Sequence, residues 1–209
     1  MFLINVADIL AERSRAGNGP RYISDIDVHF TELGPMEPQT KRPMYLPAPA
    51  IAPDLHALAE FCAAANAATP GLEVGPASVE VRWIGLDAES TRQIFELIRA
   101  GDKRGTFTLP WIVERTGSPR PHVGNHLVLI DISGRPVLLT RVVRVDSAIF
   151  GSVEAHHTAI DGSPVRDPAV WVPLHTLYWN QHLAPFGLSV SAEMPFWIEE
   201  FALVYDAGN

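Results

Sequence analysis

The segment around Gly101 constrains the fold more than any other, because helical periodicity stops there and strand patterns follow. Across residues 87–100 apolar side chains recur at the spacing of one helix face. Asp87 is suited to the N-cap of this helix, and a glycine at 101 suits the position just past its end. We therefore predict a helix that ends at Gly101 and leads directly into the apolar, aromatic run 107–111.

Strand patterns dominate the chain after this helix. Two long apolar runs, residues 127–132 and 136–145, flank a Ser-Gly turn at 133–134, which is the clearest hairpin in the sequence. Residues 79–84 and 196–205 also alternate like strands. Helical patterns are expected in three further segments, residues 54–68, 151–160 and 168–179. The predicted fold class is α+β, with a small curved or closed sheet and helices over its ends.

The first fifty residues differ from the rest of the chain. Residues 6–15 could form a short helix and residues 22–33 a strand. Six prolines follow between positions 35 and 53, a density that resists both helix and sheet. We predict an N-terminal arm over residues 1–51 and a domain over residues 52–209. The apolar side chains of the arm need burial, so we expect it to lie along the domain or along a second copy in a homodimer.

Composition excludes several classes of protein. The chain has 209 residues, is 47% hydrophobic and contains five tryptophans, as expected of a folded globular protein. Its single cysteine, Cys62, excludes a disulfide framework and a cysteine-based zinc site, and indicates a reducing compartment. The N-terminus has neither a basic lead nor a long apolar run, so we expect a cytoplasmic protein without a signal peptide or membrane span. No cofactor motif or metal-ligand spacing is present, so we expect neither.

Charge is distributed unevenly along the chain, which carries a net charge of −8. Residues 99–144 hold eight basic and three acidic side chains, whereas residues 145–209 hold one basic and eight acidic side chains. Either the two segments pair their charges in the fold, or the first forms an electropositive cleft. The acidity of the whole chain favours a small ligand over long RNA, because phosphate neutralisation needs positive charge.

A lysine and a threonine, Lys103 and Thr106, follow the predicted helix three residues apart. An ammonium and a hydroxyl in this arrangement could hold a phosphate or a base edge, or activate the hydroxyl for acyl transfer. The alternative is a solvated loop lysine and a threonine that caps a turn. Arg104 is either a phosphate contact or an exposed charge. Trp111, expected on a loop after a proline, either stacks on a base or packs in the core.

The order of these elements resembles the ASCH domain family, whose members are small relatives of the PUA barrel. The match covers roughly residues 52–209, and one segment, residues 171–179, looks like a Trp-x-x-x-His segment of a bacterial branch. The matching positions are Gly101, Lys103 and Thr106, then Val123 and Gly124, the turn at 133–134, and Glu200 and Phe201. The resemblance implies a PUA-like β-barrel with flanking helices.

The resemblance also implies a function in RNA metabolism. ASCH members are usually proposed to bind RNA, some relatives cut RNA, and others remove an acyl group from an acylated cytidine with a lysine, a threonine and a glutamate. Lys103 and Thr106 match the first two residues, and the nearest carboxylate to the third is Asp161, which is one methylene shorter than glutamate. The expected ligand contacts are Gly101, Arg104, Trp111 and Arg141.

Three interpretations of the function stay open at this point. The first is binding of RNA or a modified nucleoside in a cleft lined by Lys103 and Thr106. The second is a hydrolase, either an amidohydrolase or a ribonuclease, that uses Lys103, Thr106 and Asp161. The third is a protein–protein interaction module.

Overall fold

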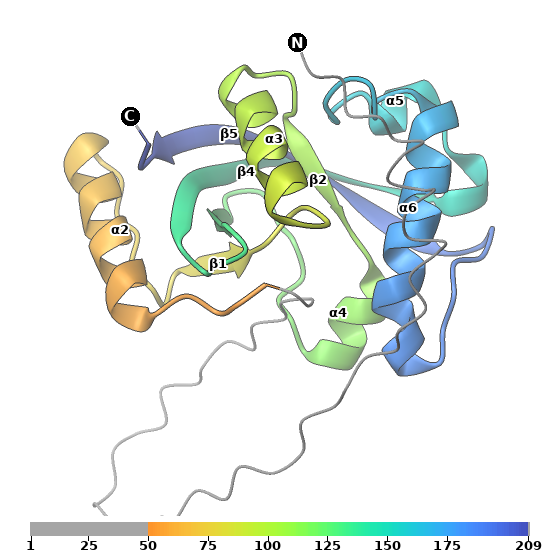
Figure 1. Ribbon diagram of the computed structural model, residues 1–209, viewed down its shortest axis with the longest axis horizontal. Helices are drawn as coiled ribbons and strands as arrows, with labels where there is room; N and C mark the ends of the chain where they lie inside the picture. Colours follow the sequence, from red (N-terminus) through yellow and green to blue (C-terminus); the bar gives the residue numbers. More distant parts are fainter. Residues whose placement is uncertain (1–49, 209) are drawn as a thin grey trace, which may run out of the picture. The chain divides into compact units, whose positions relative to one another are not determined.

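The computed structural model describes residues 50–208 of the chain. Five α-helices, two short 3-10 helices and five strands follow one another in this part of the chain (Figure 1). In chain order they are α2 (Leu55–Ala68), β1 (Val79–Arg82), α3 (Ala88–Arg99), β2 (Gly105–Thr108), α4 (Pro110–Thr116), β3 (His126–Ile130), β4 (Pro136–Ile149), η1 (Phe150–Ser152), α5 (Ala155–Thr158), α6 (Pro168–Leu183), η2 (Ala184–Phe186) and β5 (Pro195–Asp206).

Helix α3 begins and ends where its capping residues predict. The Asp87 carboxylate accepts a hydrogen bond from the Ser90 backbone N–H, and the Ser90 hydroxyl accepts one from the Asp87 N–H. Gly101 lies just past the C-cap with φ of 70°, a conformation that favours glycine. The predicted helix and its stop at Gly101 are therefore confirmed, and the chain turns immediately toward β2.

The five strands form one sheet in the order β1-β3-β4-β5-β2. Strands β1 and β3 are parallel, and the other neighbours are antiparallel. The predicted hairpin is the β3–β4 pair, and Gly134 supplies a turn residue with φ of 86°. Strand β5 returns between β4 and β2, so the last strand of the chain carries the residues that face β2.

The sheet is not closed into a barrel, which corrects the prediction of a PUA-like barrel. Strands β1 and β2 are its two edges, each only four residues long, and no backbone ladder joins them. A side chain spans the gap instead: Arg82 of β1 donates from Nη1 to the Thr108 hydroxyl of β2 at 3.0 Å. The α+β class with flanking helices is confirmed.

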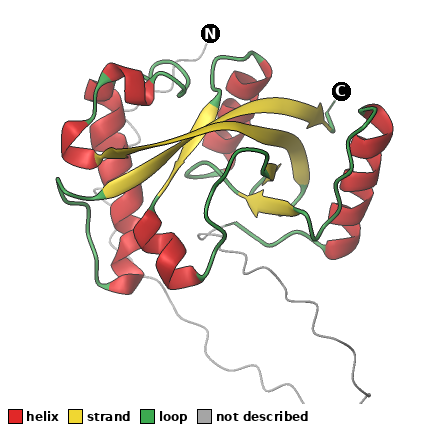
Figure 2. Ribbon diagram, turned by 180° about the vertical axis from the view of Figure 1, so that it is seen from behind, coloured by secondary structure: helices red, strands yellow, loops and turns green. Residues whose placement is uncertain are grey.

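Helices cover both faces of the sheet. Strand β3 alternates between them, so Val128 packs with α2 whereas Leu127 packs with α3. Helix α6 packs on β5 through a third cluster that includes Trp171, Trp179 and Phe196. Figure 2 shows the two long strands β4 and β5 running between the helix α2 at one end and α6 at the other.

Some expectations differ from the structure or lie outside its described part. Trp111 is not on a loop, because Pro110 occupies the first position of helix α4 and Gly117 ends that helix. The predicted arm, its helix at 6–15, its strand at 22–33 and the homodimer through the arm lie outside residues 50–208. Within these residues no helix is both long and apolar enough to cross a membrane.

Candidate functional site

Hydrogen bonds and an ion pair hold the loop after α5 against the segment that joins α3 to β2. The Arg104 backbone N–H donates to the Ile160 carbonyl at 2.7 Å. The Asp102 carboxylate accepts from the Ser163 backbone N–H at 2.9 Å and forms an ion pair with Arg166. These contacts fix the loop against the start of β2 and position Asp161, which lies between Ile160 and Ser163.

Lys103 and Asp161 form a buried ion pair. The Lys103 Nζ donates to the Asp161 Oδ1, and their side chains are only 8% and 7% exposed. The same Oδ1 accepts from the Gly162 backbone N–H at 3.0 Å. The second carboxylate oxygen of Asp161 has no hydrogen-bond partner among the described residues, yet it is not among the fully buried polar atoms and so keeps contact with solvent.

His175 of α6 is close enough to this ion pair for both charges to affect its pKa. Its ring stacks on Trp171 with centroids 3.9 Å apart, and the edge of Phe107 approaches it at 5.4 Å. Burial lowers the pKa of His175 to about 4, while the Asp161 carboxylate raises it and the Lys103 ammonium lowers it further. The imidazole is therefore neutral at pH 7 and feels both charges of the pair.

Thr106 lies on a different face of β2 from Phe107, because side chains alternate along a strand. It is the cross-strand partner of Glu199, whereas Phe107 is opposite Ile198. Thr106 is 8% exposed, and its hydroxyl has no hydrogen-bond partner in the described part of the chain. The structure thus brings Lys103 and Asp161 together, but no hydrogen bond joins either of them to Thr106.

A second buried polar cluster lies on the Thr106 face. Glu199 is fully buried and accepts from the Thr108 hydroxyl and from Arg82, whose Nη1 is 2.8 Å away. Arg82 also donates from Nε to Glu80 at 2.7 Å. Through Arg82, these side-chain contacts link the edge strand β1 to β2 and β5.

Comparison with known proteins identifies the family. A family model described as the ASCH domain matches residues 82–205, which contain Lys103, Thr106, Asp161 and His175. The chain belongs to the ASCH domain family. No curated protein matches it.

Two solved structures share the ASCH fold with this chain. One is an ASCH domain from Lactobacillus crispatus, with 19% identity and a TM-score of 0.62 over 72% of this chain and 95% of that one. The other is a protein from Enterococcus faecalis, with 19% identity and a TM-score of 0.63 over 72% of this chain and 90% of that one. At this identity the likeness concerns the fold alone.

None of the other predicted ligand contacts of the ASCH domain forms a side-chain hydrogen bond or ion pair with Lys103 or Asp161. Gly101 serves the end of α3, and Arg104 is exposed and pairs with Glu200 at 3.2 Å. Trp111 is partly buried against the α6 core. Arg141 is exposed on β4 opposite His126.

The two oppositely charged segments pair extensively within the ASCH domain. Six ion pairs join them: Arg99 with Asp206, Lys103 with Asp161, Arg104 with Glu200, Arg144 with both Asp146 and Glu200, and Arg166 with Asp102. Much of the positive charge of residues 99–144 is therefore neutralised within the fold. This pairing favours the interpretation that the two segments pair their charges in the fold over that of an electropositive cleft.

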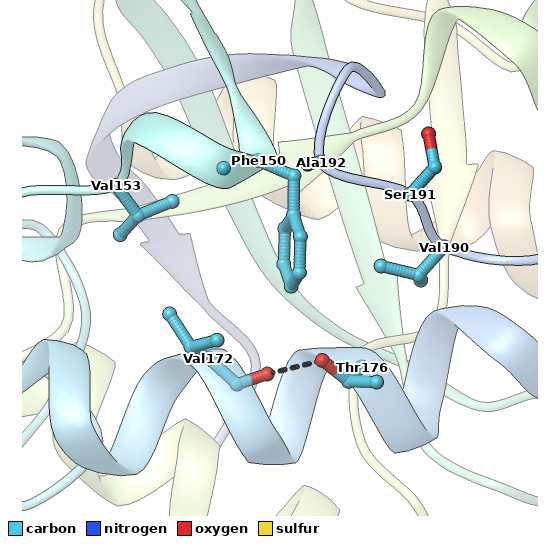
Figure 3. A pocket seen from close by; sticks show the side chains of 8 residues that line it. Phe150, Val153, Val172, Thr176, Val190, Ser191 and Ala192 are labelled. Carbon is cyan, nitrogen blue, oxygen red and sulfur yellow. Dashed lines mark hydrogen bonds between the residues drawn. The ribbon is translucent and has the colours of Figure 1, made fainter.

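A pocket of about 400 Å³ lies elsewhere in the domain, between α6, η1 and the loop before β5 (Figure 3). The Phe150 ring lies in the pocket, with Val172 and Thr176 of α6 along one wall. The Thr176 hydroxyl already donates to the Val172 carbonyl at 2.7 Å. The lining has no charged side chain and includes none of the predicted site residues.

Sequence reasoning assigned no role to His175, Arg82 or Glu199. A signal for His175 was present, because Trp171 and His175 are four residues apart and so share one face of a helix. For Glu199, the alternation of β5 places its carboxylate on the same face of the strand as Trp197 and the buried Phe201. No group of three or more His, Cys, Asp or Glu suited to a metal ion occurs in residues 50–208.

Proposed function

We propose that this ASCH domain binds a nucleoside-sized ligand, either a free modified nucleoside or a single nucleoside unit of RNA, at the Lys103–Asp161 ion pair and Thr106. The observation that carries this proposal is spare hydrogen-bonding capacity at an otherwise buried site. The Thr106 hydroxyl and the Asp161 Oδ2 lack protein partners, and Lys103 uses one of its three N–H donors. Neither oxygen is fully buried, so a ligand that enters the site can bond to both without displacing a protein partner.

Charge supports a small ligand over a long RNA strand. The chain is acidic, and five of the eight basic side chains of the 99–144 segment form ion pairs with carboxylates of the fold. A long RNA needs several free cations along its backbone, and its affinity then falls steeply with salt. A nucleoside carries no phosphate, so its affinity should change little between 50 and 200 mM salt.

A thermal-shift screen tests the proposal. A ligand that binds only the folded state stabilises it by mass action and so raises the melting temperature. At a free ligand concentration of one hundred times Kd, the gain in free energy of unfolding is about 2.7 kcal/mol. Cytidine, N4-acetylcytidine, the other nucleosides and short RNAs form the panel. Lys103→Met should abolish the shift, while Arg92→Met, which removes an exposed arginine on α3, should keep it. Equal shifts in both variants, or none with any ligand, would overturn the proposal.

Thr106 offers a finer test of the same site. Thr106→Val removes the hydroxyl at nearly constant volume, and Thr106→Ser keeps it. We expect the valine variant to bind the active ligand about tenfold more weakly and the serine variant to bind it nearly as well as the wild type. Loss of binding in both would indicate a packing role for Thr106 rather than a hydrogen bond.

A hydrolase that uses Lys103, Thr106 and Asp161 is the second candidate. The free Thr106 hydroxyl and the contact between Lys103 and a carboxylate favour it. In such a reaction the acyl–nitrogen bond breaks, water supplies a hydroxyl to the acyl group, and the amine takes a proton. A nucleophile and its base are normally within hydrogen-bond reach, and here Lys103 donates to Asp161 instead. Binding is therefore the better-supported function.

Chromatography of N4-acetylcytidine incubated with the protein distinguishes the two candidates. A hydrolase releases cytidine and acetate, and Lys103→Met and Thr106→Val then each abolish turnover, with the double variant hardly slower. Binding without release of cytidine supports the first candidate.

A further inference from the structure

Trp197 of β5 lies on the same face of the sheet as Thr106 of β2. Residues directly opposite each other in an antiparallel pair share a face, and here Thr106 is opposite Glu199 while Thr108 is opposite Trp197. The Thr108 hydroxyl donates to the Glu199 carboxylate, which confirms the shared face. Trp197 is thus a diagonal neighbour of Thr106, at a Cα separation of about 7–8 Å, which an aromatic side chain can bridge. One nucleoside can therefore contact both residues.

The Trp197 indole is partly exposed, and a guanidinium covers one of its faces. The Arg120 Cζ lies over the ring, 5.1 Å from its centroid. Arg120 itself is exposed and forms no hydrogen bond or ion pair within residues 50–208. The other four tryptophans offer no such ring, because three are buried and the fourth packs against the α6 core: Trp83, Trp171 and Trp179, and Trp111.

The backbone that carries Arg120 is stiff. Arg120 stands between Pro119 and Pro121 in the loop that joins α4 to β3. Each proline ring fixes its own φ, and Pro121 also confines Arg120 to extended backbone. Pro121 is buried and so anchors the loop to the domain. The guanidinium therefore lies over the indole from a fixed point, while its long, exposed side chain is free to move outward.

We propose that Trp197 and Arg120 form a stacking subsite, in which a planar nucleobase inserts between the indole and the guanidinium while the same nucleoside reaches the Thr106 hydroxyl. The inference rests on the proposed function, since Thr106 belongs to that site. Aromatic rings and guanidinium planes both stack on bases. Two stacked layers need about 7 Å, so the Arg120 guanidinium must move outward from its 5.1 Å position. Because every base has a flat face, this subsite adds affinity for a base with little preference among bases.

Calorimetry with cytidine tests the subsite. Trp197→Leu has no flat face and should bind cytidine about tenfold more weakly than the wild type, whereas Trp197→Phe keeps an aromatic face and should lose less. Arg120→Gln should lose about threefold. The matched control is Arg115→Gln, which removes an exposed arginine of α4 that donates to the Trp111 carbonyl, and its affinity should equal that of the wild type.

Each contrary result has a distinct meaning. Equal affinity of Trp197→Leu and the wild type would overturn the inference and leave the proposed function intact. An equal loss in Arg120→Gln and Arg115→Gln would also overturn it, because the effect would then be one of net charge and not of stacking. A wild type that binds neither cytidine nor any other nucleoside of the thermal-shift panel would overturn both the inference and the proposed function.

Indole N–H signals in proton–nitrogen NMR of the wild type give a readout that does not depend on the folding of a variant. A base stacked on Trp197 places its ring current over the indole, so the Trp197 signal should shift as cytidine is added. D-ribose has no planar ring and should leave this signal unchanged. A Trp197 signal that does not move at cytidine saturation, or that moves equally with D-ribose, would overturn the inference.

Discussion

Breaking the Lys103–Asp161 pair should destabilise the fold strongly, because either partner alone becomes an uncompensated buried charge. Removing one partner of a buried pair typically costs 3–5 kcal/mol. The two side chains are 8% and 7% exposed, so some solvent reaches them and we take the lower end, about 3 kcal/mol for Asp161→Asn. At about 2–4 °C per kcal/mol for a chain of this size, the melting temperature should fall by about 6–12 °C.

A double-mutant cycle isolates the contribution of the pair. Lys103→Met combined with Asp161→Asn removes both charges, so the double variant should be much less destabilised than the sum of the single variants, with a coupling of about 2–4 kcal/mol. Urea unfolding followed by tryptophan fluorescence measures each free energy of unfolding. The exposed pair Glu89 and Arg92 is the control, and its coupling should be far smaller because solvent screens both charges. Additive effects of the two buried substitutions would refute the reasoning.

Three further perturbations follow from the packing of the domain. Gly105→Ala places a Cβ 2.2 Å from a core side chain and 2.5 Å from a backbone oxygen, so urea unfolding should show a loss of about 1–3 kcal/mol, whereas Gly75→Ala, with no atom within 4 Å, should stay within about 0.5 kcal/mol. Arg82→Met leaves the buried Glu199 carboxylate without its guanidinium and should cost about 3–5 kcal/mol by the same assay. Burial lowers the pKa of His175 to about 4, so the neutral ring stabilises the fold above pH 6.5. This contribution to the free energy of unfolding is lost as pH falls toward 4. Melting temperatures over this range should fall further for the wild type than for His175→Phe.

Local signals in the sequence predict much of the fold. The caps at Asp87 and Gly101 bound α3, and the turn at 133–134 predicts the β3–β4 hairpin, because each depends on residues that are neighbours in the chain. Helix α4 was missed even though Pro110 and Gly117 stand at its two ends. The sequence could not show that the sheet stays open. Closure depends on whether the two edge strands β1 and β2 pair through their backbones, and nothing local in the sequence determines that.

The candidate site was predicted only in part. Lys103 and Asp161 are 58 residues apart, and the resemblance to the ASCH family suggested both, whereas spacing alone indicated neither their contact nor their burial. The contact depends on the fastening of the loop at Ile160 and Ser163, which only the fold reveals. The effect of the pair on the pKa of His175 likewise depends on how α6 packs on the sheet.

Mapping of ligand binding by backbone amide NMR tests the central claim most directly. Titration with the nucleoside that gives the largest thermal shift should perturb amides of residues 103–106, 160–162 and 171–175, and Lys103→Met should remove the perturbation. Perturbations confined to the apolar pocket around Phe150, or perturbations that persist in Lys103→Met, would contradict the claim that the ligand site of this ASCH domain is built on the Lys103–Asp161 pair.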